Sequence, residues 1–250
     1  MNISEQTYII GDCRDVLKSY PNKFGLIITS PPYNVGKEYE EIMSEDEYSD
    51  FLLSCYRAIY DSMTENSRIC VNVPFNMTNL KTDDISNIYY LNYKVLEKVG
   101  LKYRETIIWN QQNAQNGTAW GSWKSASAPW LRHQTEAILV MYKGNWNRGK
   151  GVSDITSKEF MKFVLDIWVM NCSQRDIHPC PFPTELPKRC IRLFSFVDDW
   201  ILDPFLGSGT TLLACRECNR SGVGIEKSSK YENEIKRKAL IGVKDVMKFE

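Results

Sequence analysis

The segment TSPPY, from Thr29 to Tyr33, places a hydroxyl, two prolines and an aromatic ring directly after the apolar run LII. The prolines fix the backbone, so the Ser30 hydroxyl and the carbonyls around Pro31 become oriented hydrogen-bond acceptors. Two such acceptors can hold the hydrogens of an exocyclic amine on a nucleobase and direct its lone pair, while Tyr33 stacks on the base. A Pro-Pro-Tyr run by itself is more often only the proline-terminated end of a strand.

A second segment, DPFLGSGTT, lies where an expected strand ends and a helix begins. Gly207 and Gly209 permit a tight turn and a close approach of a ligand to the main chain, and the start of the helix offers N–H groups to an anion. The loop lacks the GxGxxG spacing and has no lysine of the GKS or GKT type, which disfavours a P-loop. For the glycines alone, the alternative is an ordinary strand-to-helix turn.

Polar side chains on both sides of this loop favour a nucleoside as its ligand. Asp203 at the strand end is placed to receive a cationic amino group, and Thr210 and Thr211 are placed to bond a carboxylate. Glu226 follows roughly 20 residues on, where an acidic side chain commonly accepts both hydroxyls of a ribose.

Both segments need strands that end at one edge of a sheet. Apolar runs alternate with helical segments, which predicts a doubly wound, mostly parallel α/β sheet with right-handed crossovers. Helices are expected over about residues 46–64 and 91–99, and strands at FGLII, SRICVNVP, YRETIIWN, EAILVMYK, WILDPF and SGVGIEKS. We expect a single domain over residues 1–250 with an irregular insertion over residues 111–177.

Composition limits the classes of protein that remain. The 250 residues carry 31 lysines plus arginines and 31 aspartates plus glutamates, so the zero net charge excludes a generally basic DNA-coating protein but permits a local basic cleft. Hydrophobic residues at 43% and charged residues at 25% are typical of a folded globular domain. No apolar run suffices to span a bilayer and the first residues do not resemble a signal peptide, so we expect a cytoplasmic protein without membrane contact.

The cysteines and histidines disfavour a metal centre. Cys215 and Cys218 form a CxxC pair, but no second pair of ligands accompanies it and both fall within an expected helix. His133 and His178 are isolated, so neither a histidine-based metal site nor a Ser/His/Asp triad is expected. We therefore expect no metal and reduced, buried thiols.

TSPPYN together with DPFLGSGTT resembles motifs IV and I of the S-adenosylmethionine-dependent DNA amino-methyltransferases, and the motif order, catalytic motif first, resembles the β-group. The similarity extends in collinear order to GDCRDVL, AWGSWKSASAP, HPCPFPTELPKRCI and GVGIEKSSKY. The resemblance implies a methyltransferase-type fold in which residues 111–177 form a DNA-facing loop and a short target-recognition insertion. It also implies S-adenosylmethionine as cofactor, S-adenosylhomocysteine as its product and double-stranded DNA as the partner.

The same resemblance implies a role for each matched position. The catalytic site would comprise the four residues Ser30, Pro31, Pro32 and Tyr33. The cofactor would be held by Asp12, Pro181, Phe182, Pro183, Asp203, Phe205, Gly207, Gly209, Thr210, Thr211 and Glu226. Among these, Asp12 would accept the adenine amino group, Glu226 would bind the ribose, and residues 181–183 would close the pocket.

The residue before the two prolines bears on which base is methylated. Family members with SPPY mostly resemble cytosine-N4 methyltransferases, whereas adenine-N6 enzymes usually carry Asp or Asn at the position of Ser30. The AWGSW loop also resembles the cytosine-N4 group. The favoured activity is therefore methyl transfer to the N4 amine of a cytosine flipped out of the duplex, and adenine-N6 methylation is the alternative.

DNA contact must be local because the net charge is zero. Candidate contacts are basic and aromatic side chains of the insertion, namely Trp120, Trp123, Lys124, Arg132, Lys143, Arg148 and Lys150, with Trp130 and Trp146 interleaved. Affinity should then fall steeply with salt. The alternative for this set is a solvated charged face with its tryptophans packed in the core.

Two other classes of protein fit parts of the pattern. An RNA or protein methyltransferase more often resembles NPPY, commonly with the opposite motif order. A non-catalytic DNA-binding subunit derived from a methyltransferase should have lost the glycine loop or the Pro-Pro-Tyr motif, and both are intact. By analogy with restriction-modification systems, we expect a separate cognate endonuclease, a monomer or homodimer, and a prokaryotic or phage-like setting.

Overall fold

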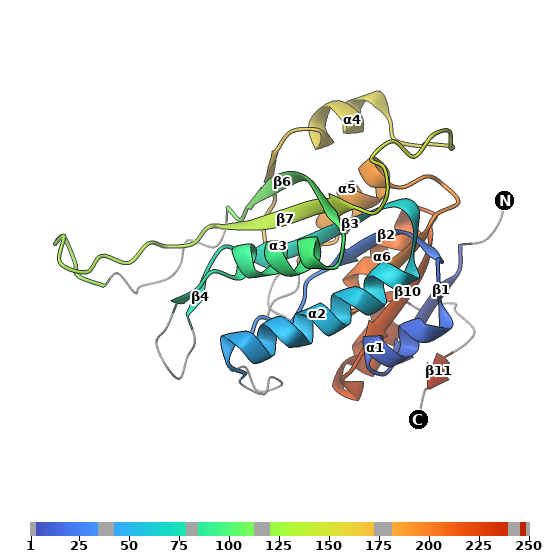
Figure 1. The fold of residues 1–250 in the computed structure, drawn as a ribbon. Coiled ribbons are helices and arrows are strands. Elements are labelled where there is room, and N and C mark those ends of the chain that lie inside the picture. The colour runs from blue at the N-terminus through green and yellow to red at the C-terminus, as the bar shows by residue number, and fades with distance from the viewer. Residues whose placement is uncertain are drawn as a thin grey trace.

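In the computed structural model, residues 4–34, 43–78, 85–112, 121–172, 182–239 and 246–248 are described. Within these ranges, a twisted sheet lies between two layers of helices (Figure 1). The predicted doubly wound α/β architecture is confirmed. No helix in these ranges is both long and apolar enough to cross a membrane.

The larger sheet is mostly parallel, as helical crossovers require. Among the described residues its strand order is β11-β1-β10-β9-β2-β3-β7-β6-β8. The first six strands in this order are parallel to one another: β1 (Gln6–Ile10), β2 (Phe24–Thr29), β3 (Met63–Pro74), β9 (Trp200–Asp203), β10 (Ser221–Glu226) and β11 (Val246–Lys248). β2 pairs with β9, and the connections leave these two strands in opposite directions, which opens a crevice at their carboxyl ends.

The strand β7 (Thr135–Tyr142) runs antiparallel between β3 and β6 (Lys102–Asn110). β8 (Ile167–Val169) then adds in parallel to β6 at the edge. The region 111–177 therefore contains regular strands, including the predicted one at EAILVMYK, and Ile138 and Val140 of β7 are completely buried. The loop before β7, described from residue 121 to 134, projects from the body of the protein. It extends on the same side as the short strand β4 (Met77–Thr78) (Figure 1).

Helices α1 (Cys13–Val16), α2 (Glu45–Ser62) and α3 (Ile88–Lys98) cover one face of the sheet. The side chains of α2 at Leu52, Tyr56 and Ile59 recur at helical spacing and are completely buried. α2 begins at a capping box between Ser44 and Glu47. It ends before residue 64, the predicted boundary, because Met63 already pairs with β2.

The opposite face is covered by α5 (Glu185–Phe194), α6 (Thr210–Glu217) and α7 (Glu232–Ala239), with α4 (Ser157–Phe163) packed on α5. β2 supplies both layers, because Ile27 faces the first core and Leu26 and Ile28 face the second. Smaller elements complete the described chain: 3₁₀ turns at Leu17–Ser19 and Ser229–Tyr231, and a hairpin of β4 (Met77–Thr78) and β5 (Ile85–Ser86).

Candidate active site

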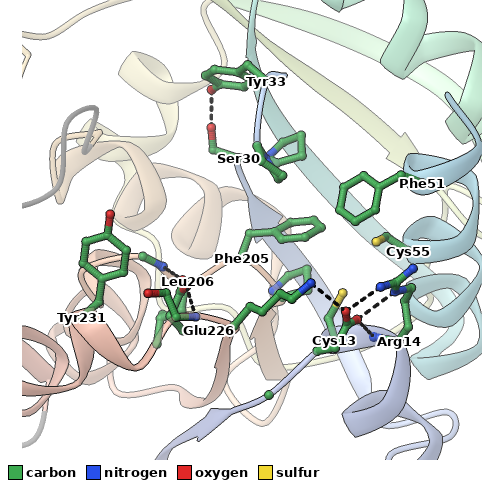
Figure 2. A pocket seen from close by; sticks show the side chains of 18 of the residues that line it. Cys13, Arg14, Ser30, Tyr33, Phe51, Cys55, Phe205, Leu206, Glu226 and Tyr231 are labelled. Atoms are coloured by element: carbon green, nitrogen blue, oxygen red, sulfur yellow. Dashed lines mark hydrogen bonds and ion pairs between the residues drawn. The ribbon is translucent and has the colours of Figure 1, made fainter. Parts of the chain in front are cut away.

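A cavity of about 790 Å³ opens at the carboxyl ends of β1, β2, β9 and β10. Its wall includes residues 11–14, 30–34, 204–208 and 226–228, with side chains of α2 on one side. In Figure 2, Phe205 lies in the middle of the view, Ser30 and Tyr33 lie on one side of it, and Glu226 and Arg14 lie on the other. A cleft of this volume accommodates a cofactor-sized molecule.

The two motifs of the sequence meet in this cavity because their strands are neighbours. β2 pairs with β9 through Leu26 with Ile201 and Ile27 with Leu202. At the end of these strands, the Thr29 hydroxyl donates a hydrogen bond to Asp203 Oδ1 at 2.9 Å, across 174 positions of sequence. The pairing thus places the Pro-Pro-Tyr turn beside the glycine loop.

The hydroxyls of Ser30 and Tyr33 both turn towards the main chain of β3. Ser30 Oγ donates to the Asn72 carbonyl at 3.1 Å and Tyr33 Oη donates to the same oxygen at 3.3 Å. The two hydroxyls also share a short hydrogen bond with each other. Both residues line the cavity, although Tyr33 is only 9% exposed. The structure therefore brings together the predicted catalytic residues and adds a partner, Asn72, that the sequence did not indicate.

The turn itself is held by α2. The Tyr48 hydroxyl donates to the Pro32 carbonyl at 2.6 Å, and Pro31 and Pro32 both line the cavity. Because proline fixes φ and offers no N–H, this contact and the strand before it determine the path of the turn. The four predicted catalytic residues are thus fixed by α2 on one side and β3 on the other.

The glycine loop takes a conformation that favours glycine. Gly207 has a φ of 55° and Gly209, the residue before α6, has a φ of 89°. Both angles lie in the left-handed region, which other residues rarely adopt. Gly207, Ser208 and Thr210 line the cavity, whereas Gly209 shapes the loop from outside the cavity wall.

Asp203 was predicted to contact the ligand, but it does not line the cavity. Its carboxylate is 1% exposed and accepts hydrogen bonds from the hydroxyls of Thr29 and Thr211 and from the Phe205 N–H. Burial raises the pKa of Asp203 from 3.8 to about 6, against these hydrogen bonds. Asp203 and Thr211 are thus hydrogen-bonded to each other behind the cavity wall, where they fix the loop.

Glu226 reaches the cavity from the end of β10. Its two carboxylate oxygens accept hydrogen bonds from the Gly207 N–H and the Ser228 N–H, each at 2.8 Å. Burial raises the pKa of this carboxyl above its usual value, against the opposing effect of those N–H groups. Glu226 thus lines the cavity and also ties the glycine loop to the adjacent strand.

Asp12 lines the cavity at the end of β1, as predicted, but it has a partner that the sequence analysis missed. Its carboxylate caps α1 and accepts from Arg14 Nε at 2.9 Å and Arg14 Nη2 at 2.6 Å. The hydrogen bond from Arg14 lowers the pKa of Asp12 to about 2. The guanidinium also lies over the Phe51 ring, 5.5 Å from its centroid. The only signal for Arg14 in the sequence was its place two residues after Asp12.

Three predicted residues precede α5. Phe182 lines the cavity, Pro183 lies outside the cavity wall, and Pro181 lies outside the described residues. The aromatic wall therefore includes Phe182 together with Phe51 and Phe205, of which Phe51 was not predicted.

The predicted DNA contacts separate into two groups at opposite edges of the sheet. Trp123, Lys124 and Arg132 lie in the projecting loop before β7, where Trp123 is 64% exposed. Trp130 in the same loop is 65% exposed. Trp120 lies outside the described residues.

Lys143, Arg148 and Lys150 follow the other end of β7, which pairs with the start of β3. The Lys143 ammonium is buried against the carbonyls of Tyr60 and Met63, at 2.9 and 3.0 Å. Arg148 is paired with Asp199 and shielded from solvent. All three residues thus lie beyond the end of β7 remote from the Pro-Pro-Tyr turn, and Lys143 and Arg148 are engaged in contacts within the protein.

The CxxC pair lies in and just after α6. Cys215 is completely buried and Cys218 is 2% exposed. Within the described ranges, no group of three or more histidine, cysteine, aspartate or glutamate side chains is arranged to hold a metal ion.

Solved structures define the class of protein to which this fold and site belong. TTHA0409 from Thermus thermophilus, solved with S-adenosyl-L-methionine, superposes with a TM-score of 0.75 at 25% identity, over 98% of this chain and 100% of that one. The cytosine-N4-specific DNA methyltransferase PvuII has a similar fold, with a TM-score of 0.78 at 20% identity over 97% and 89% of the two chains. The fold is that of S-adenosylmethionine-dependent DNA methyltransferases.

The sequence profile of the N6/N4-type DNA methylases matches residues 24–237, and this chain belongs to that family. It is 39% identical over 153 residues to the type II methyltransferase M.MjaVI of Methanocaldococcus jannaschii, an alignment that covers 59% of this chain and 77% of that protein. The family resemblance inferred from the motifs is therefore confirmed, and the protein is a DNA amino-methyltransferase.

Proposed function

We propose that the chain transfers a methyl group from S-adenosylmethionine to the exocyclic N4 amine of a cytosine flipped out of double-stranded DNA. The observation that carries this proposal is the geometry of Ser30. Ser30 lines the cofactor-sized cavity, and its hydroxyl proton is directed to Asn72 or Tyr33. A hydroxyl held in this way accepts a hydrogen bond from the amine rather than donating one to it.

The residues around the cavity fit the proposed cofactor. Glu226 offers carboxylate oxygens at the end of β10, where a ribose is commonly bound, and Phe205 offers an aromatic face. Thr210 and the loop before it offer a hydroxyl and main-chain groups to the amino-acid end. When bound, S-adenosylmethionine supplies a methyl group on a positively charged sulfur, which is a strong electrophile.

The protein's own residues orient the amine for a direct displacement. The amine nitrogen forms a bond to the methyl carbon as the bond from that carbon to sulfur breaks, and the nitrogen then releases a proton. Ser30 Oγ accepts one amine hydrogen, and the Tyr33 ring at the cavity wall packs on the base. Holding the two reacting groups together accounts for most of the acceleration, so no basic side chain is needed.

The choice of cytosine rests on the serine. Ser30 is a neutral acceptor, and family members with serine before the two prolines mostly resemble cytosine-N4 enzymes. Methylation of adenine N6 is the second candidate, because the same geometry serves either amine.

Mass spectrometry of nucleosides from duplex DNA treated with the protein and S-adenosylmethionine tests this proposal. We expect N4-methylcytosine to appear, and its rate of formation to fall by about 10²-fold or more when the Ser30→Ala variant is used. Appearance of N6-methyladenine instead would show that the serine does not select the base. Absence of both from DNA of varied sequence would refute the proposed reaction.

The projecting loop is the proposed DNA-contacting surface. Lys124→Ala and Arg132→Ala should each weaken duplex binding and reduce the slope of log affinity against log salt by roughly 1. The physical reason is that each cation which neutralises a phosphate releases a counterion. Fluorescence anisotropy over roughly 50–200 mM salt measures both quantities.

Lys150→Ala is the matched control, since this exposed cation lies at the opposite edge of the sheet. Its binding curve and salt slope should equal those of the unmodified protein. An equal effect of all three substitutions would argue against the loop as a specific surface. We further propose a separate endonuclease partner in a prokaryotic cytoplasm, in keeping with relatives named type II methyltransferases.

A further inference from the structure

Three side chains form an interstrand cluster behind Ser30: Asn72 on β3, Glu136 on β7 and Gln111 just after β6. Asn72 Nδ2 donates to Glu136 Oε2 at 2.6 Å, and Gln111 Nε2 donates to Glu136 Oε1 at 2.7 Å. The carboxylate of Glu136 therefore links the ends of three strands.

The cluster is a consequence of the direction of β7. Because β7 is antiparallel, its first residues meet the last residues of β3, and Glu136 lies opposite Pro74 on β3 and Trp109 on β6. This is the edge at which β2 ends in the Pro-Pro-Tyr turn. A parallel strand at this position would begin at the opposite edge of the sheet.

Stability alone does not account for the cluster. Asn72 is 3% exposed, and among the described residues its Oδ1 atom has no hydrogen-bond partner. A buried polar atom without a partner costs free energy, and an apolar residue would fill the same space without that cost. The arrangement therefore points to a role for Asn72 beyond packing.

We assign that role to the main-chain carbonyl of Asn72, whose position the side chain helps to fix. The Asn72 carbonyl accepts hydrogen bonds from both Ser30 Oγ and Tyr33 Oη, which also bond to each other. Ser30 has a single hydroxyl proton. Whether it goes to the carbonyl or to Tyr33, it is directed inwards, and at least one lone pair of Ser30 is left for a hydrogen of the amine.

The direction of that proton affects the reaction. If the Ser30 hydroxyl rotated and donated its proton to the amine nitrogen, the hydrogen bond would occupy the lone pair that must attack the methyl group. The carbonyl of Asn72 prevents this rotation only while it stays at its present position, and the side chain of Asn72 is anchored on Glu136.

We propose that Glu136 is a positioning residue for methyl transfer, which acts through Asn72 to keep the Ser30 hydroxyl an acceptor towards the amine. This inference rests on the proposed function only in requiring an amine as methyl acceptor. It holds equally for cytosine N4 and adenine N6. Glu136 does not line the cofactor cavity, so its effect should be on the transfer step rather than on cofactor binding.

The test uses Asn72→Asp, which keeps the shape of the side chain but places a second carboxylate against Glu136. Two carboxylates at this separation resist ionising together, so they share a proton at low pH and repel each other at high pH, where both are ionised. The single-turnover rate of labelled methyl transfer should be close to that of the unmodified protein at low pH. It should fall by on the order of 10²-fold as the pH rises, the loss expected from a displacement of about 1 Å.

The double variant Asn72→Asp with Glu136→Gln restores a donor and an acceptor to the pair. The amide introduced at position 136 can donate a hydrogen bond to the carboxylate introduced at position 72, while its oxygen still accepts from Gln111. The rate and its pH profile should return to those of the unmodified protein. Asn92→Asp is the matched control, because Asn92 is also buried and hydrogen-bonded but lies in α3; its melting temperature should fall without a change in the pH profile of transfer.

The outcomes separate this inference from the proposed function. A pH-independent rate for Asn72→Asp, or a folded double variant that stays slow, overturns the role of Glu136 even if the unmodified protein makes N4-methylcytosine. Transfer by the unmodified protein to adenine alone overturns the choice of base and leaves the inference standing if the two variants behave as expected. A protein that transfers methyl to no amine overturns both.

Discussion

Replacement of Ser30 by alanine should lower the rate of methyl transfer by about 10²-fold or more, with no change in the affinity for S-adenosylmethionine. In the proposed mechanism the hydroxyl is the acceptor that orients the amine, so its loss should affect the transition state more than the ground state. Glu226 lies on the other side of Phe205 from Ser30 (Figure 2), so the substitution should leave the proposed ribose contact unchanged. Single-turnover kinetics measure the rate, and isothermal titration calorimetry measures the affinity.

Ser62→Ala is the matched control for this experiment. Ser62 is completely buried and its hydroxyl donates to the Ile59 carbonyl at 2.7 Å, so the same chemical change is made inside α2. Its rate should equal that of the unmodified protein. Tyr33→Phe should cause a smaller loss than Ser30→Ala, because the ring is kept. An equal loss of rate and cofactor affinity in Ser30→Ala would contradict the separate roles of the two ends of the cavity.

Replacement of Glu226 by glutamine should weaken binding of S-adenosylmethionine by about 10- to 100-fold, the effect of losing charge-assisted hydrogen bonds. The carboxylate also accepts from the N–H groups of Gly207 and Ser228, and an amide would turn a donor towards one of them. Binding should therefore suffer through the ligand contact and through the glycine loop. Calorimetry with S-adenosylmethionine and no DNA isolates this effect.

The pH dependence of cofactor binding should report the same carboxyl. Burial raises the pKa of Glu226, so in the free protein it takes up a proton at a higher pH than an exposed glutamate. In the proposed complex, the ribose hydroxyls donate hydrogen bonds to the ionised carboxylate of Glu226. The affinity for S-adenosylmethionine should therefore be highest above the raised pKa of Glu226 and should fall as the pH falls through that pKa. The Glu226→Gln variant should lack this dependence.

Glu217→Gln provides the same change of charge outside the cavity, at an ion pair with Lys188 between α6 and α5. Its affinity for S-adenosylmethionine and the pH dependence of that affinity should match the unmodified protein. If Glu226→Gln bound the cofactor as tightly as Glu217→Gln, the carboxylate would not be a ligand of the ribose.

Much of the fold follows from local patterns. The alternation of apolar strands and amphipathic helices predicted a mostly parallel sheet, and the strands ended near the expected residues because prolines and glycines follow them. The same local signals placed TSPPY and DPFLGSGTT at strand ends. Since parallel strands end at one edge, the sequence was sufficient to predict a shared site at that edge.

The direction of β7 did not follow from its sequence. EAILVMYK is apolar along its length, and a strand buried on both faces has the same pattern whether it is parallel or antiparallel. Its pairing between β3 and β6 decides that Glu136 lies near the active site. The same pairing places Lys143 at the opposite edge, where its ammonium donates a hydrogen bond to the Tyr60 carbonyl in α2.

The sequence by itself determined the chemical groups of this protein: a serine before two prolines, a glycine loop and an acid at the next strand end. Only the tertiary structure decided what those groups touch. It turned Asp203 into the interior and set the Ser30 hydroxyl against the Asn72 carbonyl, 42 positions away. The reason is physical, because a local pattern fixes the conformation of a segment, whereas hydrogen-bond partners across a sheet depend on strand order and register.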